Sequence, residues 1–214
     1  MLYGKRRDDM PLIENPKIDE NTEAYKLAQK FYYEEVKYDY IPNGILAHMV
    51  VPEIGKAALN LMFAVLKHES RVSAELKMLI ANMTSYAVGC TYCQTNTYEA
   101  TLNMSEDNEK LQRIWDYQND PLFSEAERAA LDLALAASSS PNAVTDELRE
   151  NLKKHFGQAE CAEIMATISV FSYFQKWNDT NGTTLEPHVI NVAENELLGK
   201  GHLDENKFAT LKGN

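Results

Sequence analysis

Two cysteines separated by two residues, Cys90 and Cys93, are the side chains of this chain best suited to chemistry. They follow Gly89, which stands where a glycine commonly ends a helix, and a new helix is expected from Cys90 to about Asn103. Because one helical turn separates the two cysteines, their sulfur atoms can approach disulfide distance. Unbonded N–H groups and the positive end of the helix dipole favour a thiolate there. The spacing therefore predicts a redox-active dithiol.

A lowered thiol pKa raises the fraction of nucleophile at neutral pH, which peroxide reduction or disulfide exchange requires. The first thiolate to be oxidised becomes a sulfenic acid, and the second cysteine resolves it to a disulfide. Two other interpretations stay open. Buried, inert cysteines are common in apolar helices. The pair could also be half of a zinc site, although zinc usually takes four ligands and the histidines are scattered at His48, His68, His155, His188 and His202.

The third cysteine, Cys161, lies on an apolar stripe with Met165, Ile168 and Phe171, which predicts a small buried hydrophobe rather than a reactive thiol. Three cysteines are too few for a disulfide scaffold in a chain of 214 residues. In a reducing compartment a close pair instead indicates a catalytic, redox-sensing or metal-binding role.

Composition is that of an ordinary globular protein, with 44% hydrophobic and 25% charged residues. The formal charge of −11 and the lack of a basic cluster beyond Lys5-Arg6-Arg7 argue against nucleic acid and anionic membranes as partners. The first residues carry no apolar signal region, and no apolar run reaches the roughly 18 residues of a membrane span. We therefore expect a cytoplasmic protein.

Helical periodicity predicts an all-α protein of roughly seven to nine helices. The expected helices lie after Asn21, after Pro52, from Ser73 to Gly89, from Cys90, from the capping box at residues 124–127, over 146–156 and over the apolar stretch 161–171. Turn residues separate them at 41–44 and 138–142. Short apolar runs such as Ile45-Leu46-Ala47 cannot be assigned by period alone.

Three parts of the chain are expected from these patterns. Residues 1–20, interrupted by Pro11 and Pro16, predict an extended N-terminal arm. Residues 21–186 would form a single helical domain. Residues 187–214 would be a C-terminal extension or an oligomerisation arm.

The segment Gly89-Cys90-Thr91-Tyr92-Cys93, preceded by an amphipathic helix, resembles the core of the alkylhydroperoxidase D (AhpD)-like, carboxymuconolactone decarboxylase family. Ile41-Pro42-Asn43, followed by Ala47-His48 and Pro52, is similar to an upstream helix entry of that family. Residues 174–178 resemble the aromatic–Asn end of a later helix. The resemblance covers roughly residues 38–186.

The resemblance implies an AhpD-like helical bundle, a homo-trimer or homo-hexamer, and reduction of hydroperoxides through the cysteine pair without a cofactor or metal. It assigns Cys93 as the thiolate that attacks the peroxide and Cys90 as the more accessible resolving thiol. A thiol or a dihydrolipoamide-bearing protein would supply the electrons.

The family's proton relay is not matched in this sequence. Its usual glutamate, twelve residues before the first cysteine, is replaced by Met78, and its usual histidine, four residues after the second, by Thr97. Glu75 lies one turn before Met78 on the same helical face and could act through a water or through Tyr92, although an exposed surface carboxylate is an equally good interpretation. Tyr92, a donor or a packing aromatic, and Thr97 could each offer a hydroxyl. By its place in the chain, His48 is the most plausible replacement base, or a partly buried structural residue.

Two classes of function follow from these residues. The first is an enzyme, a thiol-dependent hydroperoxide reductase that acts through Cys90 and Cys93. The alternative is a redox-inactive or non-catalytic oligomer of the same fold, in which the missing relay residues mark lost chemistry. Decarboxylase or lactone chemistry is disfavoured, because family members with that activity usually lack the cysteine pair and use a histidine that cannot be placed here.

Overall fold

The computed structural model describes residues 11–14, 17–35, 38–66, 71–104 and 108–212. These residues contain no strand and form eleven α-helices, so the all-α prediction is confirmed and the helix number is higher than expected. The additional helices are short, since α2 (Asn43–His48), α6 (Glu109–Arg113), α10 (Pro187–Val192) and α11 (Glu205–Leu211) span at most seven residues each. Such lengths carry too little periodic pattern to be recognised. Lys5-Arg6-Arg7, with the rest of residues 1–10, and His68 lie outside the described residues.

The chain divides into two compact units. One comprises the described parts of Met1–Ala64 and Lys176–Asn214, and the other is Val65–Gln175. The long helix α9 (Gln158–Asn181) contributes residues to both. The domain limits expected after residues 20 and 186 stay predictions.

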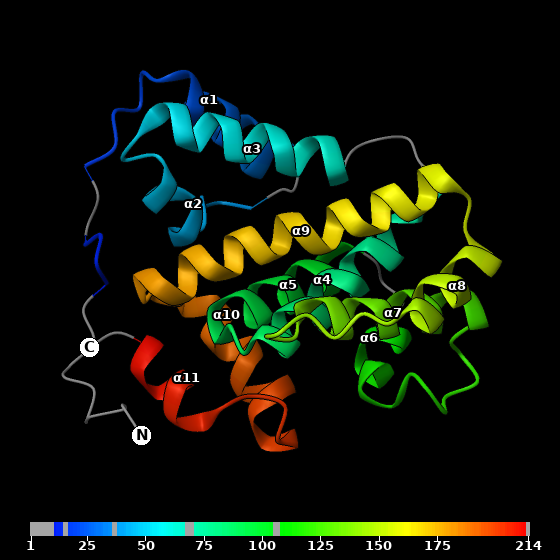
Figure 1. Cartoon of the computed structure of the whole chain (residues 1–214). Coiled ribbons are helices and arrows are strands. Elements are labelled where there is room, and N and C mark those ends of the chain that lie inside the picture. The colour runs from blue at the N-terminus through cyan, green and yellow to red at the C-terminus, as the bar shows by residue number, and fades with distance from the viewer. Residues whose placement is uncertain (1–10, 15–16, 36–37, 67–70, 105–107, 213–214) are drawn as a thin grey trace. The chain divides into compact units, whose positions relative to one another are not determined.

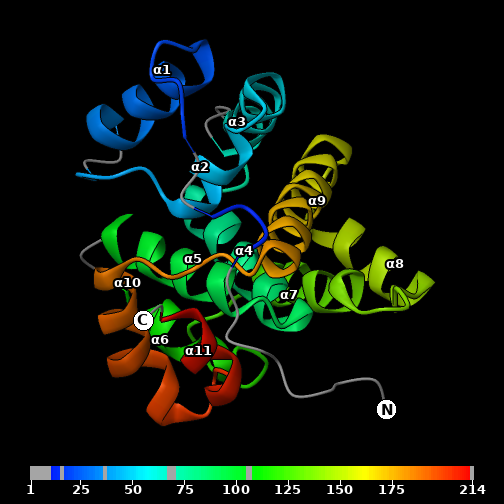
Figure 2. The same cartoon turned by 90° about the vertical axis from the view of Figure 1, so that its left-hand side faces the viewer.

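In the unit 65–175, four helices build the framework around the cysteine pair: α4 (Ala74–Val88), α5 (Thr91–Met104), α7 (Glu125–Ser138) and α8 (Asp146–His155). The helix α4 packs against α5 and α7, and α7 packs against α8 (Figures 1 and 2). Every residue from Leu76 to Ser85 in α4 is buried. This central helix therefore fixes where α5 begins.

Local signals explain where α4 begins and ends. The Ser73 side chain accepts the backbone N–H of Leu76, as an N-cap serine does. At the other end Gly89 has φ 74°, a left-handed conformation that side chains disfavour, and its N–H returns to the carbonyls of Ser85 and Tyr86. Both limits of this helix were predicted from the sequence and are confirmed.

Capping also sets the starts of α7 and α8. The predicted capping box at α7 is present, with the Ser124 side chain accepting from the Glu127 backbone and Glu127 accepting from the Ser124 backbone. The Thr145 side chain caps α8 by accepting from Leu148. Between these helices, residues 139–145 are non-helical, as the turn signals at 138–142 predict.

The unit that holds both ends of the chain begins with α1 (Glu23–Gln29), a π-helical turn (Lys30–Glu35), α2 and α3 (Pro52–Leu66), and ends with α10, a π-helical and a 3-10 turn (Ala193–Leu197, Leu198–Lys200) and α11. The described residues 11–14 and 17–20 are non-helical, and Leu12 N–H bonds the Asn181 carbonyl. That residues 1–20 form an extended arm stays a prediction. The C-terminal stretch folds within its own unit, since Leu185 N–H bonds the Leu211 carbonyl at 2.8 Å. A role for it in oligomerisation stays a prediction.

Gly44 in α2 is explained by a close approach within this unit. A Cβ atom at Gly44 would stand 2.4 Å from the Asn178 Oδ1 atom, so any larger residue would have to displace the Asn178 side chain. The neighbouring Asn43 backbone N–H donates to Glu186 at 2.6 Å, which fixes the start of α2. The Pro42-Asn43 and Asn178 segments that carry part of the family resemblance therefore meet in one packing cluster.

Candidate functional site

The cysteine pair lies at the start of α5, and both cysteines are free and buried (Cys90 1% and Cys93 5% exposed). Cys90 occupies the N-cap position, because its carbonyl accepts the N–H of Gln94 at 2.8 Å. Its Sγ accepts the backbone N–H of Cys93 at 3.3 Å, as a serine or aspartate oxygen would. A negative charge on the Cys90 sulfur would be stabilised by the Cys93 N–H and by the helix dipole.

The two sulfur atoms are 2.6 Å apart, closer than unbonded sulfur atoms pack. A disulfide bond is about 2.05 Å long, so the pair stands close to bonding distance without large movement of the backbone. The approach of the two sulfurs expected from the spacing is thus present.

Both cysteines are buried, Cys90 at 1% and Cys93 at 5% exposure. The Cys90 side chain folds back over the first turn of α5 in its N-cap role. The expectation that Cys90 is the more accessible, resolving thiol stays a prediction. Burial also leaves the interpretation of two inert cysteines open to experiment.

The residues at the family's relay positions form a neutral hydrogen-bonded cluster between α4 and α5. The buried Asn82 amide donates to the Met78 carbonyl and to the Thr101 hydroxyl, each at 2.9 Å. The Thr97 hydroxyl lies 2.8 Å from the Cys93 carbonyl and 3.3 Å from Asn82 Oδ1. The Thr97 hydroxyl therefore donates to the backbone carbonyl of Cys93 and not to its sulfur.

Tyr92, between the two cysteines, is buried at 4% exposure. Its carbonyl accepts the Asn96 side-chain amide at 3.1 Å, which holds the first turn of α5 in shape. A proton-donating role for the Tyr92 hydroxyl stays a prediction.

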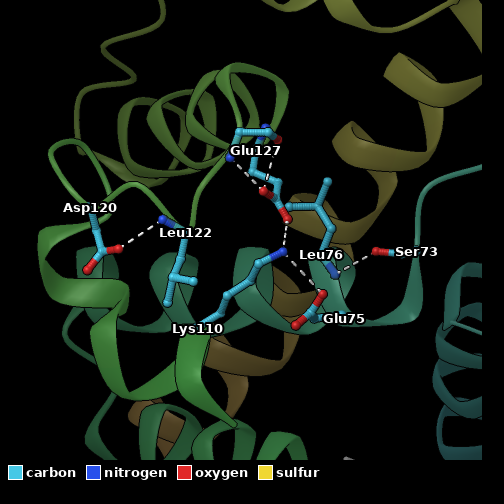
Figure 3. A network of polar contacts seen from close by, with 8 residues as sticks. Ser73, Glu75, Leu76, Lys110, Asp120, Leu122 and Glu127 are labelled. Atoms are coloured by element: carbon cyan, nitrogen blue, oxygen red, sulfur yellow. Dashed lines mark hydrogen bonds and ion pairs between the residues drawn. The ribbon is translucent and has the colours of Figure 1, made fainter. Parts of the chain in front are cut away.

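Glu75 forms part of a charged cluster at the opposite end of α4 (Figure 3). Its side chain is 49% exposed and stands 3.5 Å from Lys110, which also binds Glu127 at 2.6 Å. Burial lowers the pKa of Lys110, but the two carboxylates outweigh burial and raise that pKa overall. Ten residues of helix separate Glu75 from Ser85, which is about 15 Å along the axis. The structure does not bring Glu75 into contact with the cysteine pair, and its relay role stays a prediction.

His48 lies in the unit that holds both chain ends, at the end of α2. It is fully buried, its Nδ1–H donates to the Gly44 carbonyl at 2.5 Å, and its ring stacks on Trp177 with centroids 4.0 Å apart. Burial lowers the pKa of His48 to about 4, although the bond to Gly44 works in the other direction. The imidazole is therefore neutral at pH 7, and its role as a base stays a prediction.

The third cysteine departs from expectation. Cys161 is only partly buried and Met165 is 54% exposed, whereas Ile168 and Phe171 of the predicted stripe are buried together with Ile164. Burial raises the pKa of the Cys161 thiol, so this cysteine stays protonated at neutral pH. It offers a matched control for the reactive pair.

Two fully buried polar side chains were missed in the sequence. Lys77 of α4 donates to the Val65 carbonyl at 2.7 Å and lies 3.2 Å from a Glu163 oxygen, which secures α4 to α9. Gln175 of α9 donates to the Ser85 hydroxyl at 3.0 Å. Gln175 continues the buried stripe four residues after Phe171, so an amide on an apolar face was the available signal.

Two searches for other kinds of site concern the described part of the chain only. No group of three or more His, Cys, Asp and Glu side chains there is placed to hold a metal ion. No helix there is both long and apolar enough to cross a lipid bilayer.

The all-helical fold is similar to that of solved AhpD-like proteins. Residues 52–136 match the model of the carboxymuconolactone decarboxylase family, a stretch that runs from α3 into α7 and contains the cysteine pair. The AhpD-like, carboxymuconolactone decarboxylase-type resemblance indicated by the sequence is thereby confirmed.

A curated relative, the uncharacterized protein YnjA of Escherichia coli (strain K12), is 29% identical over 112 residues. The match covers 52% of this chain and 62% of that relative.

Solved structures share the fold over most of the chain. The debrominase Bmp8 superposes with a TM-score of 0.73 at 25% identity, over 79% of this chain and 89% of that one. An uncharacterized peroxidase-related protein from Silicibacter sp. TM1040 gives a TM-score of 0.71 at 19% identity, over 87% and 97% of the two chains. The second likeness shows the fold alone.

Proposed function

We propose that this protein is a dithiol–disulfide oxidoreductase that reduces hydroperoxides through Cys90 and Cys93. The observation that carries the proposal is the approach of the two sulfur atoms to 2.6 Å at a helix start, where the Cys90 sulfur accepts the Cys93 N–H. The match of residues 52–136, which contain both cysteines, to the carboxymuconolactone decarboxylase family supports the proposal.

In the proposed reaction the Cys93 thiolate attacks the terminal oxygen of the hydroperoxide. The O–O bond breaks, the alkoxide leaves and takes a proton as the alcohol, and Cys93 becomes a sulfenic acid. Cys90 then attacks the Cys93 sulfur, and the sulfenic oxygen leaves as water with the second thiol proton. The balance is one hydroperoxide and two thiols giving one alcohol, one water and one disulfide.

The resulting disulfide has to be reduced before a second turnover. An external thiol or a dihydrolipoamide-type dithiol would supply two electrons and two protons by thiol–disulfide exchange. We place this cycle in the reducing cytoplasm, where such donors keep thiols reduced. A homo-trimer or homo-hexamer is part of the same proposal.

The test is oxidation of the reduced full-length protein with one equivalent of tert-butyl hydroperoxide, followed by thiol alkylation and peptide mass mapping. We expect a Cys90–Cys93 disulfide and stoichiometric tert-butanol. Cys161→Ser is the matched control and should react like the unchanged protein. Full alkylation of both cysteines after exposure to peroxide would support the redox-inactive alternative instead.

A second candidate is reductive debromination, favoured by the 25% identity to the debrominase Bmp8. A cysteine-to-alanine variant of that protein binds 2,3,4-tribromopyrrole. The corresponding balance here would be one aryl bromide and two thiols giving the arene, bromide, a proton and a disulfide. Bromide release from tribromopyrrole by the reduced protein, absent in Cys93→Ser, would favour this activity over peroxide reduction.

A further inference from the structure

A buried glutamine, Gln175 of α9, is bonded to the turn that presents the cysteines. Its amide nitrogen donates to the Ser85 hydroxyl at 3.0 Å, and both side chains are fully buried. The Ser85 carbonyl in turn accepts the N–H of Cys90 at 3.2 Å. Gln175 is thus joined to the dithiol turn through a single residue.

The orientation of this amide follows from the hydrogen available on Ser85. The Ser85 hydroxyl donates its one hydrogen to the Ala81 carbonyl at 2.8 Å. Its oxygen can therefore only accept from Gln175, and a carbonyl oxygen facing it would have nothing to accept. The Gln175 nitrogen must face Ser85, which leaves the amide oxygen, Oε1, on the other side of the group.

That oxygen is a buried acceptor that receives no hydrogen bond from the residues the structure describes. Leaving such an atom unbonded costs free energy that an apolar side chain would avoid. The preceding residues of the buried stripe, Ile164, Ile168 and Phe171, are apolar. An amide at the next position of the stripe thus points to a donor from outside the protein.

The proposed chemistry requires an O–H group in this region. The hydroperoxide carries one, and a water that moves the thiol proton carries two. Met78 and Thr97 occupy the family's relay positions without a titratable carboxylate or imidazole. A fixed acceptor next to the dithiol turn can orient an O–H group without itself gaining a proton.

We propose that Gln175 Oε1 accepts a hydrogen bond from an O–H group at the Cys90–Cys93 dithiol, supplied either by the bound hydroperoxide or by a water. The inference rests on the proposed function, because it assigns Gln175 as a positioning residue for that reaction. Ser85 holds the amide in the orientation that presents the oxygen. Replacing Gln175 should change the thiol alkylation profile and kcat if the O–H group belongs to a water, and KM if it belongs to the hydroperoxide.

The test compares Gln175→Met, similar in length but without an amide, with the unchanged protein. One arm measures the apparent thiol pKa of Cys90 and Cys93 by pH-dependent iodoacetamide alkylation without peroxide. The other measures kcat and KM for tert-butyl hydroperoxide with dithiothreitol as the reductant. A water site predicts a thiol alkylation profile moved to higher pH and a kcat at least fivefold lower. A hydroperoxide site predicts a KM at least fivefold higher with an unchanged alkylation profile.

Matched variants separate positioning from packing. Thr167→Val removes another fully buried polar group of α9, whose hydroxyl bonds the Glu163 carbonyl, and should change neither arm. Gln175→Asn withdraws the amide by one methylene and should move the readouts in the same direction as Gln175→Met, which covers the case in which the methionine variant does not fold.

Alkylation profile, kcat and KM all within twofold in a folded Gln175 variant would overturn the proposal. Failure of the proposed function gives a different pattern. The unchanged protein would then form no disulfide with peroxide, while the alkylation arm would still report whether Gln175 orients a water at the thiols.

Discussion

The two ends of α4 hold polar side chains under opposite conditions. Near its C-terminal end, Asn82 and Ser85 are fully buried and bond neutral partners on α5 and α9. At its first turn, Glu75 is half exposed and belongs to a charged cluster with Lys110 and Glu127 (Figure 3). One helix thus carries a neutral interior network and a charged surface network, with Glu75 about 10 Å from Asn82 and about 15 Å from Ser85 along its axis.

The comparison indicates which end of α4 supports chemistry and which end contributes only a little to stability. Hydrogen bonds inside the protein are fixed in geometry, and losing one partner leaves the other unsatisfied. Exposed ion pairs are screened by water and salt and contribute little. We therefore assign the thiol chemistry to the buried end and only a small stabilising role to the charged end.

The largest effect is expected from the cysteines themselves. Cys93→Ser should reduce peroxide-dependent oxidation to the level of a protein-free control, because a serine hydroxyl is not ionised at neutral pH and cannot form the sulfenic acid. Cys90→Ser should still consume one equivalent of peroxide but stop at the sulfenic acid, which a dimedone adduct on Cys93 detects by mass spectrometry. Dimedone labelling of Cys90 in Cys93→Ser would reverse the assigned roles.

The next effect concerns the buried network. Asn82→Leu removes the amide bonded to Met78 and Thr101 and leaves the Thr97 hydroxyl with fewer partners. We expect a loss of about 1–3 kcal/mol in the free energy of unfolding, measured by urea denaturation. Asn96→Leu, which removes a partly exposed amide of α5, is the control and should cost less. Equal losses of unfolding free energy in the two variants would show that the buried Asn82 network is no more stabilising than the partly exposed Asn96 amide.

The sequence predicted those parts of the site that are determined by residues close together in the chain. Ser73 and Gly89 mark the limits of α4, and Cys90 opens α5, because capping is decided within a few residues. The bond between Gln175 and Ser85 joins residues 90 positions apart, which only the packing of α9 on α4 creates. The pairing of Glu75 with Lys110 likewise depends on how α6 packs near the start of α4, which the local sequence does not determine. Of the stripe that periodicity predicted, Ile168 and Phe171 are buried, whereas Cys161 is only partly buried and Met165 is exposed.

A smaller effect is expected in the charged cluster. Burial raises the pKa of Glu127, but Lys110 and Ser124 lower it below its ordinary value overall. A lowered folded-state pKa contributes stability above the ordinary carboxyl pKa and loses it as the pH falls. Lys110→Met should therefore cost about 0.5–1 kcal/mol at pH 7 and low salt, and much less at pH 3 or in 1 M NaCl. A loss that is the same under all three conditions would show that packing, not charge, is responsible.

The smallest effect is expected at Glu75. Glu75→Gln should leave the rate of peroxide-dependent disulfide formation within twofold, because the contact that the structure gives this carboxylate is the exposed pair with Lys110. Stopped-flow tryptophan fluorescence or quenched alkylation can follow the rate. A tenfold slower reaction at an unchanged unfolding midpoint would instead make Glu75 a proton relay for the dithiol and remove the distinction between the two ends of α4.

The account depends most directly on whether Cys90 and Cys93 form a reversible disulfide. The decisive measurement is equilibration of the folded protein in glutathione buffers of graded ratio, with the redox state of each cysteine read by alkylation and mass mapping. We predict a single two-electron transition between Cys90 and Cys93, in the range of about −180 to −270 mV typical of dithiol oxidoreductases, with Cys161 unaffected by the pair. Two thiols that stay reduced at every ratio would contradict the redox assignment.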